Sequence, residues 1–230
     1  MPSHPQLAHL DGLLDDPRLA GSAAAFDADG TLWAGDVGEL ILQAMIGLGQ
    51  APHDAIQIYE DLLSRDAPAA CAYCVELLRG TSLDALEAWS RELVKTQLHG
   101  PLYDPVVGLA QALASRGCEV WVVSGSNRWT VEVAVDAAGL DPRRVLALSC
   151  PVKNKQLTGE VDRPLTCAEG KVTALRAATS KPLIFAAGNA LYDLALLDHA
   201  ERQLVVAPRG APTPLRAVAS ARGWPVLDVR

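Results

Sequence analysis

Two aspartates spaced two residues apart follow a short apolar run in the first part of the chain. Asp27 and Asp29 come directly after residues 23–26, and a Gly-Thr pair follows them. Small apolar residues bounded by a glycine turn predict a buried strand that runs into a loop. Because residues i and i+2 of a strand point the same way, we expect both carboxylates at the carboxyl end of this strand. Open α/β sheets bind their ligands at that edge.

A close pair of carboxylates favours chemistry at phosphorus. The two charges repel each other unless a metal ion separates them or one carboxyl holds a proton. In either case one carboxylate can attack phosphorus while the other manages the proton. A bare Asp-x-Asp is also typical of turns and helix caps, so the remaining polar residues must decide between the two interpretations.

Further polar residues stand where other apolar runs end. Ser124 and Gly125 follow one run, and Asn189 follows another, with Asp193 four residues later; Lys171 opens a predicted helix. Gly125 lets backbone amides approach an anion closely, and Ser124 offers a hydroxyl to a phosphoryl oxygen. Each residue alone is typical of a cap, a turn or a solvated charge. At one edge of a parallel sheet, together, they would surround a phosphate.

The elements that position these residues change in character along the chain. A short helix is expected over residues 5–19. Residues 35–99 carry four helical stripes and no strand signal, which predicts an all-helical insert. Beyond residue 100, strands alternate with helices, and a small hairpin is expected within residues 152–164. Alternation of this kind predicts an α/β fold with a mainly parallel sheet, interrupted by the insert just after its first strand.

Composition narrows the classes of protein that need considering. The chain has 230 residues, half of them hydrophobic, which allows one large domain or a core with a smaller insert. A net charge of -7 argues against nucleic-acid or anionic-membrane partners. We expect a cytoplasmic protein, because the sequence shows neither a signal-peptide pattern nor an apolar run of the roughly 20 residues that a membrane helix needs. The oligomeric state is left open.

The spacing of two cysteines could indicate a redox or metal site in place of a phosphate site. Cys71 and Cys74 have the spacing of a redox or metal motif. They lie inside a helical pattern without a preceding strand, which favours reduced thiols in a packed helix. The remaining cysteines are also expected to be reduced.

The motifs together resemble those of the haloacid dehalogenase superfamily, and more narrowly its phosphoserine-phosphatase-like branch. In chain order they are DADGT, VVSGS, GK within AEGKV, and GNALYD, and the segment KQLTGEV is also similar to that branch. The resemblance extends over residues 26–198. It implies a Rossmann-like core formed by residues 1–34 and 100–230, with a helical cap domain over residues 35–99.

The resemblance also implies a mechanism of phosphate-ester hydrolysis. Asp27 would attack phosphorus to form an aspartyl-phosphate, and Asp29 would protonate the leaving oxygen and then activate water. Ser124, Gly125 and Lys171 would hold the phosphoryl group, whose transfer depends mostly on positioning and charge. Departure of halide needs no proton, and the dehalogenases of this superfamily lack the second aspartate, so its presence favours phosphate esters.

Magnesium is the cofactor that the resemblance implies. The ion would bridge Asp27, the carbonyl oxygen of Asp29 and the fourth motif. That motif usually begins with Gly-Asp, but here Asn189 stands in place of the aspartate. An amide oxygen can bind Mg²⁺ without adding charge, so we expect weaker affinity. Asp193, about one helical turn on, would lie behind Asn189 or take its place as the ligand.

The substrate stays open among small phosphorylated metabolites. In related phosphatases a cap carboxylate meets a substrate ammonium, and Asp36 and Glu39 are placed to do so. A cap arginine often meets a substrate carboxylate, and the candidates are Arg65, Arg79 and Arg91. Phosphoserine is the first expectation and phosphocholine the second. The alternative is a degenerate phosphate-binding or regulatory protein with little turnover, for which Asn189 is the support.

Overall fold

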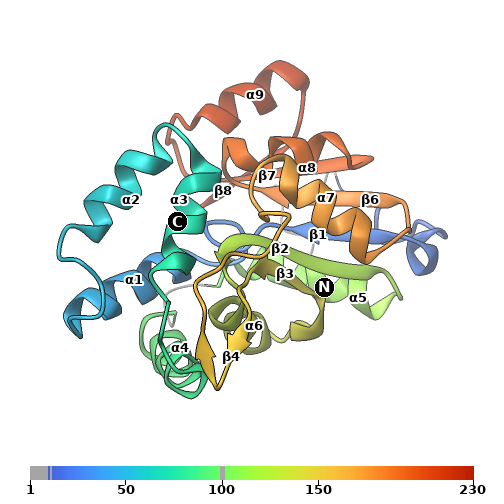
Figure 1. Ribbon diagram of the computed structural model, residues 1–230. Helices are drawn as coiled ribbons and strands as arrows, with labels where there is room; N and C mark the ends of the chain where they lie inside the picture. Colours follow the sequence, from blue (N-terminus) through green and yellow to red (C-terminus); the bar gives the residue numbers. More distant parts are fainter. Residues whose placement is uncertain (1–9, 11, 99–101) are drawn as a thin grey trace.

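A six-stranded parallel sheet forms the centre of the protein. The computed structural model describes residues 10, 12–98 and 102–230 (Figure 1). The strand order is β3-β2-β1-β6-β7-β8, with every pairing parallel. The strands are β1 (Ala23–Phe26), β2 (Glu119–Asn127), β3 (Val145–Leu148), β6 (Leu183–Gly188), β7 (Arg202–Pro208) and β8 (Val226–Val229). The predicted Rossmann-like α/β fold is confirmed.

Strand β1 occupies the middle of the sheet. All four of its residues are buried, and Phe26 pairs with Val122 of β2 on one side and Ala187 of β6 on the other. Burial on both faces explains why its sequence is continuously apolar and does not alternate. The chain builds outwards from β1 through β2 and β3, then returns to add β6, β7 and β8 on the opposite side. The reversal creates the crevice at the strand ends where ligands bind in such sheets.

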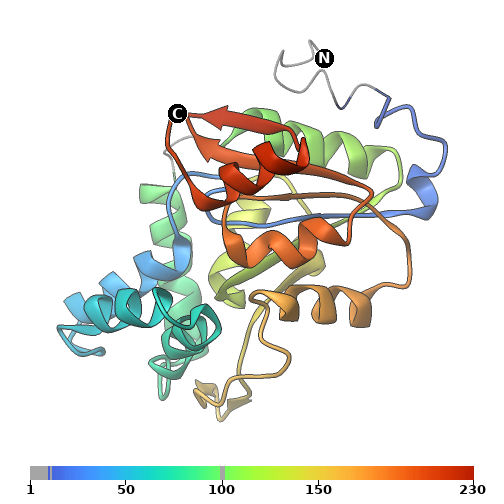
Figure 2. The ribbon, with the colours of Figure 1, turned by 90° about the horizontal axis from the view of Figure 1, so that it is seen from above.

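Helices cover both faces of the sheet (Figure 2). Alternate residues of β1 pack into two different clusters, one with α5 and α6 and the other with α7, α8 and α9. These helices are α5 (Asp104–Ser115), α6 (Arg128–Ala137), α7 (Glu169–Ala178), α8 (Leu194–Asp198) and α9 (Pro214–Arg222). The three-layer arrangement buries both apolar faces of the sheet.

A helical segment separates β1 from the rest of the sheet. Its helices are α1 (Val37–Gly47), α2 (Ala55–Leu63), α3 (Ala67–Glu76) and α4 (Leu83–Gln97). Figure 1 shows them together on one side of the sheet, and residues 37–98 hold no strand. The side chains of Asp36, Asp66 and Ser82 accept hydrogen bonds from first-turn backbone N–H groups, which fixes where three of the helices begin. That the segment forms a separate cap domain over residues 35–99 stays a prediction.

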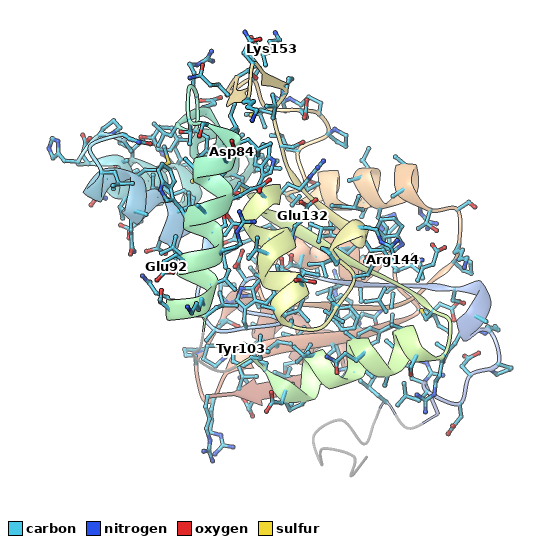
Figure 3. The ribbon with its side chains drawn as sticks, turned by 90° about the horizontal axis from the view of Figure 1, so that it is seen from below. Asp84, Glu92, Tyr103, Glu132, Arg144 and Lys153 are labelled. Atoms are coloured by element: carbon cyan, nitrogen blue, oxygen red, sulfur yellow. The ribbon has the colours of Figure 1, made fainter. Side chains whose placement is uncertain are left out.

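A small antiparallel hairpin, which follows β3 in the chain, contacts this helical segment. It consists of β4 (Val152–Lys153) and β5 (Gln156–Leu157), as predicted within residues 152–164. The turn residues Asn154 and Lys155 have positive φ, as tight hairpin turns require. Leu157 exchanges backbone hydrogen bonds with residues 80 and 81 of the helical segment. Figure 3 shows Lys153 of the hairpin and Asp84 of α4 at the same end of the molecule.

Two local predictions were wrong. Residues 12–18 form turns, followed by a 3₁₀ turn at Leu19–Gly21, where part of a helix over residues 5–19 was expected; residues 5–9 and 11 lie outside the described part. Gly12 has positive φ and Pro17 disfavours helix at the residue before it, which explains the turns. Strand β2 continues to Asn127, beyond the expected end at residue 123, through a register shift against β3. No helix in the described residues is long and apolar enough to span a membrane.

Candidate active site

A buried lysine joins two carboxylates that are far apart in the sequence. Lys171 Nζ lies 2.6 Å from Asp27 Oδ1 and 2.6 Å from Asp193 Oδ1. The three side chains come from α7, from the loop after β1 and from a 3₁₀ helix (Leu191–Asp193) that follows β6, and all three are buried. Burial opposes the charge on Lys171, but Asp193 and Asp27 outweigh it and raise the pKa of the ammonium above its ordinary value. The expected convergence at the sheet edge is therefore present.

Asp27 is a buried carboxylate with a protein donor on each of its oxygens. Its Oδ1 accepts from Lys171, and its Oδ2 accepts from the Thr31 hydroxyl at 2.9 Å. Its backbone N–H donates to the carbonyl of Ala187 at 2.9 Å, which ties the residue to β6. Burial and the negative charge of Asp193 raise the pKa of Asp27 to about 6, against the opposing effect of Lys171. The carboxyl is therefore mostly ionised at neutral pH.

Asp29 lies in a different environment two residues later. Its Oδ1 accepts from Trp33 Nε1 and from the backbone N–H of Val37, both at 2.9 Å, and its Oδ2 accepts from Ser126 Oγ at 2.7 Å. Burial, with a smaller contribution from the charge of Asp36, raises the pKa of Asp29 to about 8. The pKa of Asp29 therefore lies above that of Asp27, and Asp29 holds its proton to a higher pH. Two carboxyls with separated pKa values are the arrangement that acid–base chemistry uses.

Ser124 and Gly125 lie in β2, beside the loop that carries the aspartates. Ser124 is buried; its Oγ accepts from the backbone N–H of Ser126 at 3.0 Å, and its carbonyl accepts from Thr166 Oγ1 at 2.6 Å. A Cβ on Gly125 would come within 3.0 Å of Cys71 Sγ on α3. The helical segment therefore lies directly over the end of β2. Cys71 and Cys74 are both free thiols, as expected.

Asp193 organises the loop that follows β6. Its Oδ2 accepts from the backbone N–H groups of Asn189 and Ala190, each at 3.0 Å, while Oδ1 faces Lys171. A Cβ on Gly188 would lie 2.5 Å from the Cβ of Asp193, so only glycine permits this close return of the chain. Both carboxylate oxygens of Asp193 are thus engaged by protein donors.

Asn189 lies against the loop that carries Asp29. A Cβ on Gly30 would come within 2.0 Å of Asn189 Nδ2, and Gly30 also has a φ of +73°. Oxygen ligands are the ones that Mg²⁺ prefers, and the Asp27 carboxylate, the Asp29 carbonyl and the Asn189 amide supply that type of donor. The donor set therefore fits Mg²⁺ in kind but carries one carboxylate fewer than the usual motif. No group of three or more His, Cys, Asp or Glu side chains suited to a metal occurs among the described residues.

The two acidic residues expected to meet a substrate ammonium, Asp36 and Glu39, have different surroundings in the structure. Asp36 caps α1 by accepting from the backbone N–H of Glu39 at 2.9 Å, and it lies 3.4 Å from Ser126 Oγ. Glu39 instead accepts from Gln43 one turn along the same helix. The helical segment thus brings Asp36 beside Asp29, whereas the Glu39 side chain interacts along its own helix.

Two of the three candidate arginines have partners elsewhere, and the third lies beside the segment after the hairpin. Arg65 donates to the Asp61 carbonyl, and Arg91 pairs with Glu87 at 3.4 Å. A Cβ on Gly159 would lie 2.9 Å from the Cβ of Arg79, so that arginine borders the segment after the hairpin. None of these contacts involves the group around Asp27.

Sequence interpretation missed two residues that hold the aspartates. Thr31 donates to Asp27, and Ser126 donates to Asp29. Ser126 belongs to the second motif but was given no role. Its position two residues after Ser124 in an extended strand was a usable signal, because both side chains then point the same way.

Comparison with known proteins agrees with the fold and the motifs. The sequence pattern of the family described as haloacid dehalogenase-like hydrolase matches residues 24–198. No curated protein matches the chain.

Several solved structures share the fold. A protein of unknown function from Bordetella pertussis Tohama I has a TM-score of 0.76 and 23% identity, with 90% of this chain and 98% of that chain covered. A phosphoserine phosphohydrolase-like protein from Francisella tularensis has a TM-score of 0.61 and 17% identity, covering 80% and 87%. A phospho-aspartyl intermediate analogue of phosphoserine phosphatase has a TM-score of 0.57 and 19% identity, covering 80% and 86%.

Proposed function

The chain belongs to the haloacid dehalogenase-like hydrolases, and we propose that it is a phosphatase that hydrolyses a small phosphomonoester through an aspartyl-phosphate. The observation that carries this proposal is the convergence of Asp27, Lys171 and Asp193 at the sheet edge, with both carboxylates 2.6 Å from the Lys171 ammonium. Burial raises the pKa of Asp29 further than that of Asp27, which suits Asp27 for attack and Asp29 for proton transfer.

The proposed reaction has two steps. In the first, an Asp27 oxygen bonds to phosphorus, the bond to the leaving oxygen breaks, and Asp29 gives its proton to that oxygen. In the second, Asp29 takes a proton from water, the water oxygen bonds to phosphorus, and the acyl-phosphate bond breaks to release phosphate and restore Asp27. Proton transfer of this kind accelerates reactions by roughly 10²–10⁴-fold.

Three groups are proposed to hold the phosphoryl oxygens. Ser124 Oγ accepts a hydrogen bond from Ser126, which leaves its own hydroxyl proton to be donated to the substrate. The backbone N–H of Gly125 and the Lys171 ammonium complete the set. Because Lys171 is held by two carboxylates, its position is fixed before substrate arrives, which is the preorganisation that electrostatic catalysis needs.

Mg²⁺ is the proposed cofactor. The Asp27 carboxylate, the Asp29 carbonyl and the Asn189 amide would hold it, and the ion would supply positive charge beside the phosphoryl oxygens. Asp193 is proposed to act behind these ligands, because its oxygens already accept from Lys171 and two backbone N–H groups.

Phosphorylated amino alcohols such as phosphocholine are the proposed substrates ahead of phosphoserine. Phosphoserine carries a carboxylate, and two of the expected arginines, Arg65 and Arg91, interact with residues of their own helical segment. Asp36 uses Oδ1 to cap α1 and to contact Ser126, and its other oxygen is proposed to meet a substrate ammonium. A panel of phosphorylated metabolites, with initial rates compared at equal concentration, ranks these substrates.

Hydrolysis of 4-nitrophenyl phosphate tests the proposed activity. We expect turnover that requires Mg²⁺ and falls at least about a thousandfold in Asp27→Asn. Asp84→Asn is the matched control, since Asp84 is exposed at the start of α4 and should leave the rate unchanged (Figure 3). A wild-type protein whose melting temperature rises with phosphate but that shows no turnover would instead indicate a phosphate-binding or regulatory protein.

A further inference from the structure

Ser126 connects two acidic side chains that come from different segments. Its Oγ lies 2.7 Å from Asp29 Oδ2, in the loop after β1, and 3.4 Å from Asp36 Oδ1, at the start of α1. The serine itself stands near the end of β2 and is 8% exposed. Three segments of the chain therefore meet at a single hydroxyl.

We infer that Ser126 is a positioning residue, which holds Asp29 Oδ2 in place for proton transfer to the leaving group; this inference rests on the proposed phosphatase function. The other oxygen, Oδ1, already accepts from Trp33 Nε1 and the Val37 N–H. Oδ2 is therefore the oxygen left for proton transfer, and the Ser126 hydroxyl contacts it at 2.7 Å.

A serine suits both halves of the proposed reaction. A hydroxyl donates one hydrogen bond and accepts others. It can accept from Asp29 when that carboxyl holds its proton, with its own proton directed to Asp36, and it can donate to Asp29 after the proton has left. The same 2.7 Å contact can thus hold the carboxyl before and after proton transfer.

Gly38 makes room for this arrangement. A Cβ on Gly38, in the first turn of α1, would come within 2.7 Å of Ser126 Oγ and 3.1 Å of Asp36 Oδ1. A side chain there would push the Ser126 hydroxyl away from Asp29. Gly38→Ala is therefore a second way to disturb the contact, and it leaves both interacting side chains chemically intact.

The leaving group supplies the test. Full-length protein with Mg²⁺ is assayed with a series of aryl phosphates, from 4-nitrophenyl phosphate, whose phenolate leaves without help, to 4-methoxyphenyl phosphate, whose phenolate needs a proton. We expect Ser126→Ala to lower kcat/KM by about tenfold for the methoxy substrate and by less than about twofold for the nitro substrate. The ratio kcat/KM reports the step in which the leaving group departs.

Two comparisons separate positioning from a general structural effect. Ser90→Ala is the matched control, because Ser90 is also buried and its hydroxyl also has two oxygen neighbours, the Leu86 carbonyl and Thr130 Oγ1. It should leave the dependence on leaving group unchanged, whereas Gly38→Ala should steepen that dependence as Ser126→Ala does. Adding Ser126→Ala to Asp29→Asn should cause no further loss, since the group that it positions is gone.

The outcomes distinguish the two proposals. Equal losses for all leaving groups in Ser126→Ala, or additive losses with Asp29→Asn, would overturn the positioning role while the phosphatase function stands. A wild-type protein that hydrolyses none of the aryl phosphates would overturn both. Thermal unfolding of each variant shows that the compared proteins are folded.

Discussion

Lys171 and Asp193 form a buried ion pair, with 2.6 Å between Nζ and Oδ1, and Asp193 uses its other oxygen to hold the loop after β6. The Asp193 side chain thereby connects the backbone of the fourth motif with Lys171 of α7. Lys171 in turn contacts Asp27. The position of the proposed nucleophile depends on this ion pair as well as on its own strand.

Removing the lysine should destabilise the protein strongly. Lys171→Met leaves Asp27 and Asp193 buried without their cation, and breaking a buried pair in this way lowers the free energy of unfolding by about 3 kcal/mol or more. Urea unfolding at pH 8 measures the loss. The control is Lys181→Met, which removes a surface pair with Glu119 and should lower the free energy by less than about 1 kcal/mol. Equal losses in the two variants would contradict this account.

The stability of the metal-free protein should fall as pH rises. Asp29 has a pKa of about 8 in the folded state, above its ordinary value of 3.8, so the folded state binds the additional proton between these limits. The contribution of Asp29 to stability is then fully present below about pH 4 and is lost as the pH rises through about 8. Asp36, whose pKa is also raised by burial, acts in the same direction.

Asp29→Asn should remove part of this decline. Relative to wild type, the variant should gain stability between pH 5 and pH 8, measured from urea unfolding in the presence of a chelator. Some decline remains in the variant because Asp27 and Asp36, whose pKa values are also raised by burial, are still present. Parallel stability profiles for the two proteins would show that Asp29 titrates similarly in the folded and unfolded states.

Asn189→Asp should bind Mg²⁺ more tightly than wild type. The change adds a negative charge beside the proposed ligands, and we expect the dissociation constant from calorimetric titration to fall by about tenfold, which corresponds to about 1.4 kcal/mol. Without metal, the extra charge beside Asp193 should lower the melting temperature. Asn154→Asp, in the turn of the hairpin, is the matched control and should change neither quantity. Unaltered affinity in Asn189→Asp would remove Asn189 from the proposed metal site.

The parallel sheet, and the position of the four motifs at one of its edges, were predictable because both depend on short stretches of sequence. The apolar run before Asp27 and the polar residues after other runs specify buried strands and their carboxyl ends, and parallel strands bring those ends to one edge. The hairpin was predictable for the same reason, since its turn is encoded by adjacent residues. Gly12 and the Asp16-Pro17 pair were equally local, but the leucine spacing around them was given too much weight.

The contacts inside the site depend on long-range packing and could not be predicted. Lys171 and Asp27 are separated by 144 residues, and nothing local indicates that a single ammonium joins Asp27 to Asp193. The environment of Asp29 likewise depends on where α1 begins, because Asp36 and the Val37 N–H reach it only when that helix packs against β2. The separated pKa values of the two aspartates therefore follow from tertiary structure.

Gly30→Ala should test whether the loop carrying Asp29 and the Asn189 side chain act as one unit. An alanine at this position is unfavourable for two reasons. Its φ would be +73°, which strains a residue with a Cβ, and its Cβ would come within 2.0 Å of Asn189 Nδ2. The control is Gly210→Ala, which has nearly the same φ, +72°, but no neighbouring atom within 4 Å. Backbone strain of this kind lowers the free energy of unfolding by about 1 kcal/mol in both variants.

The difference between the two variants isolates the contact with Asn189. We expect Gly30→Ala to lose about 1–3 kcal/mol beyond the loss in Gly210→Ala, the usual range for overpacking a buried site. It should also weaken Mg²⁺ binding in the same titration that is used for Asn189→Asp, because the alanine displaces the Asn189 amide from its place against the loop that carries Asp29. Equal losses of stability in the two glycine variants, with Mg²⁺ affinity unchanged, would mean that Asn189 moves aside freely and is not held against this loop.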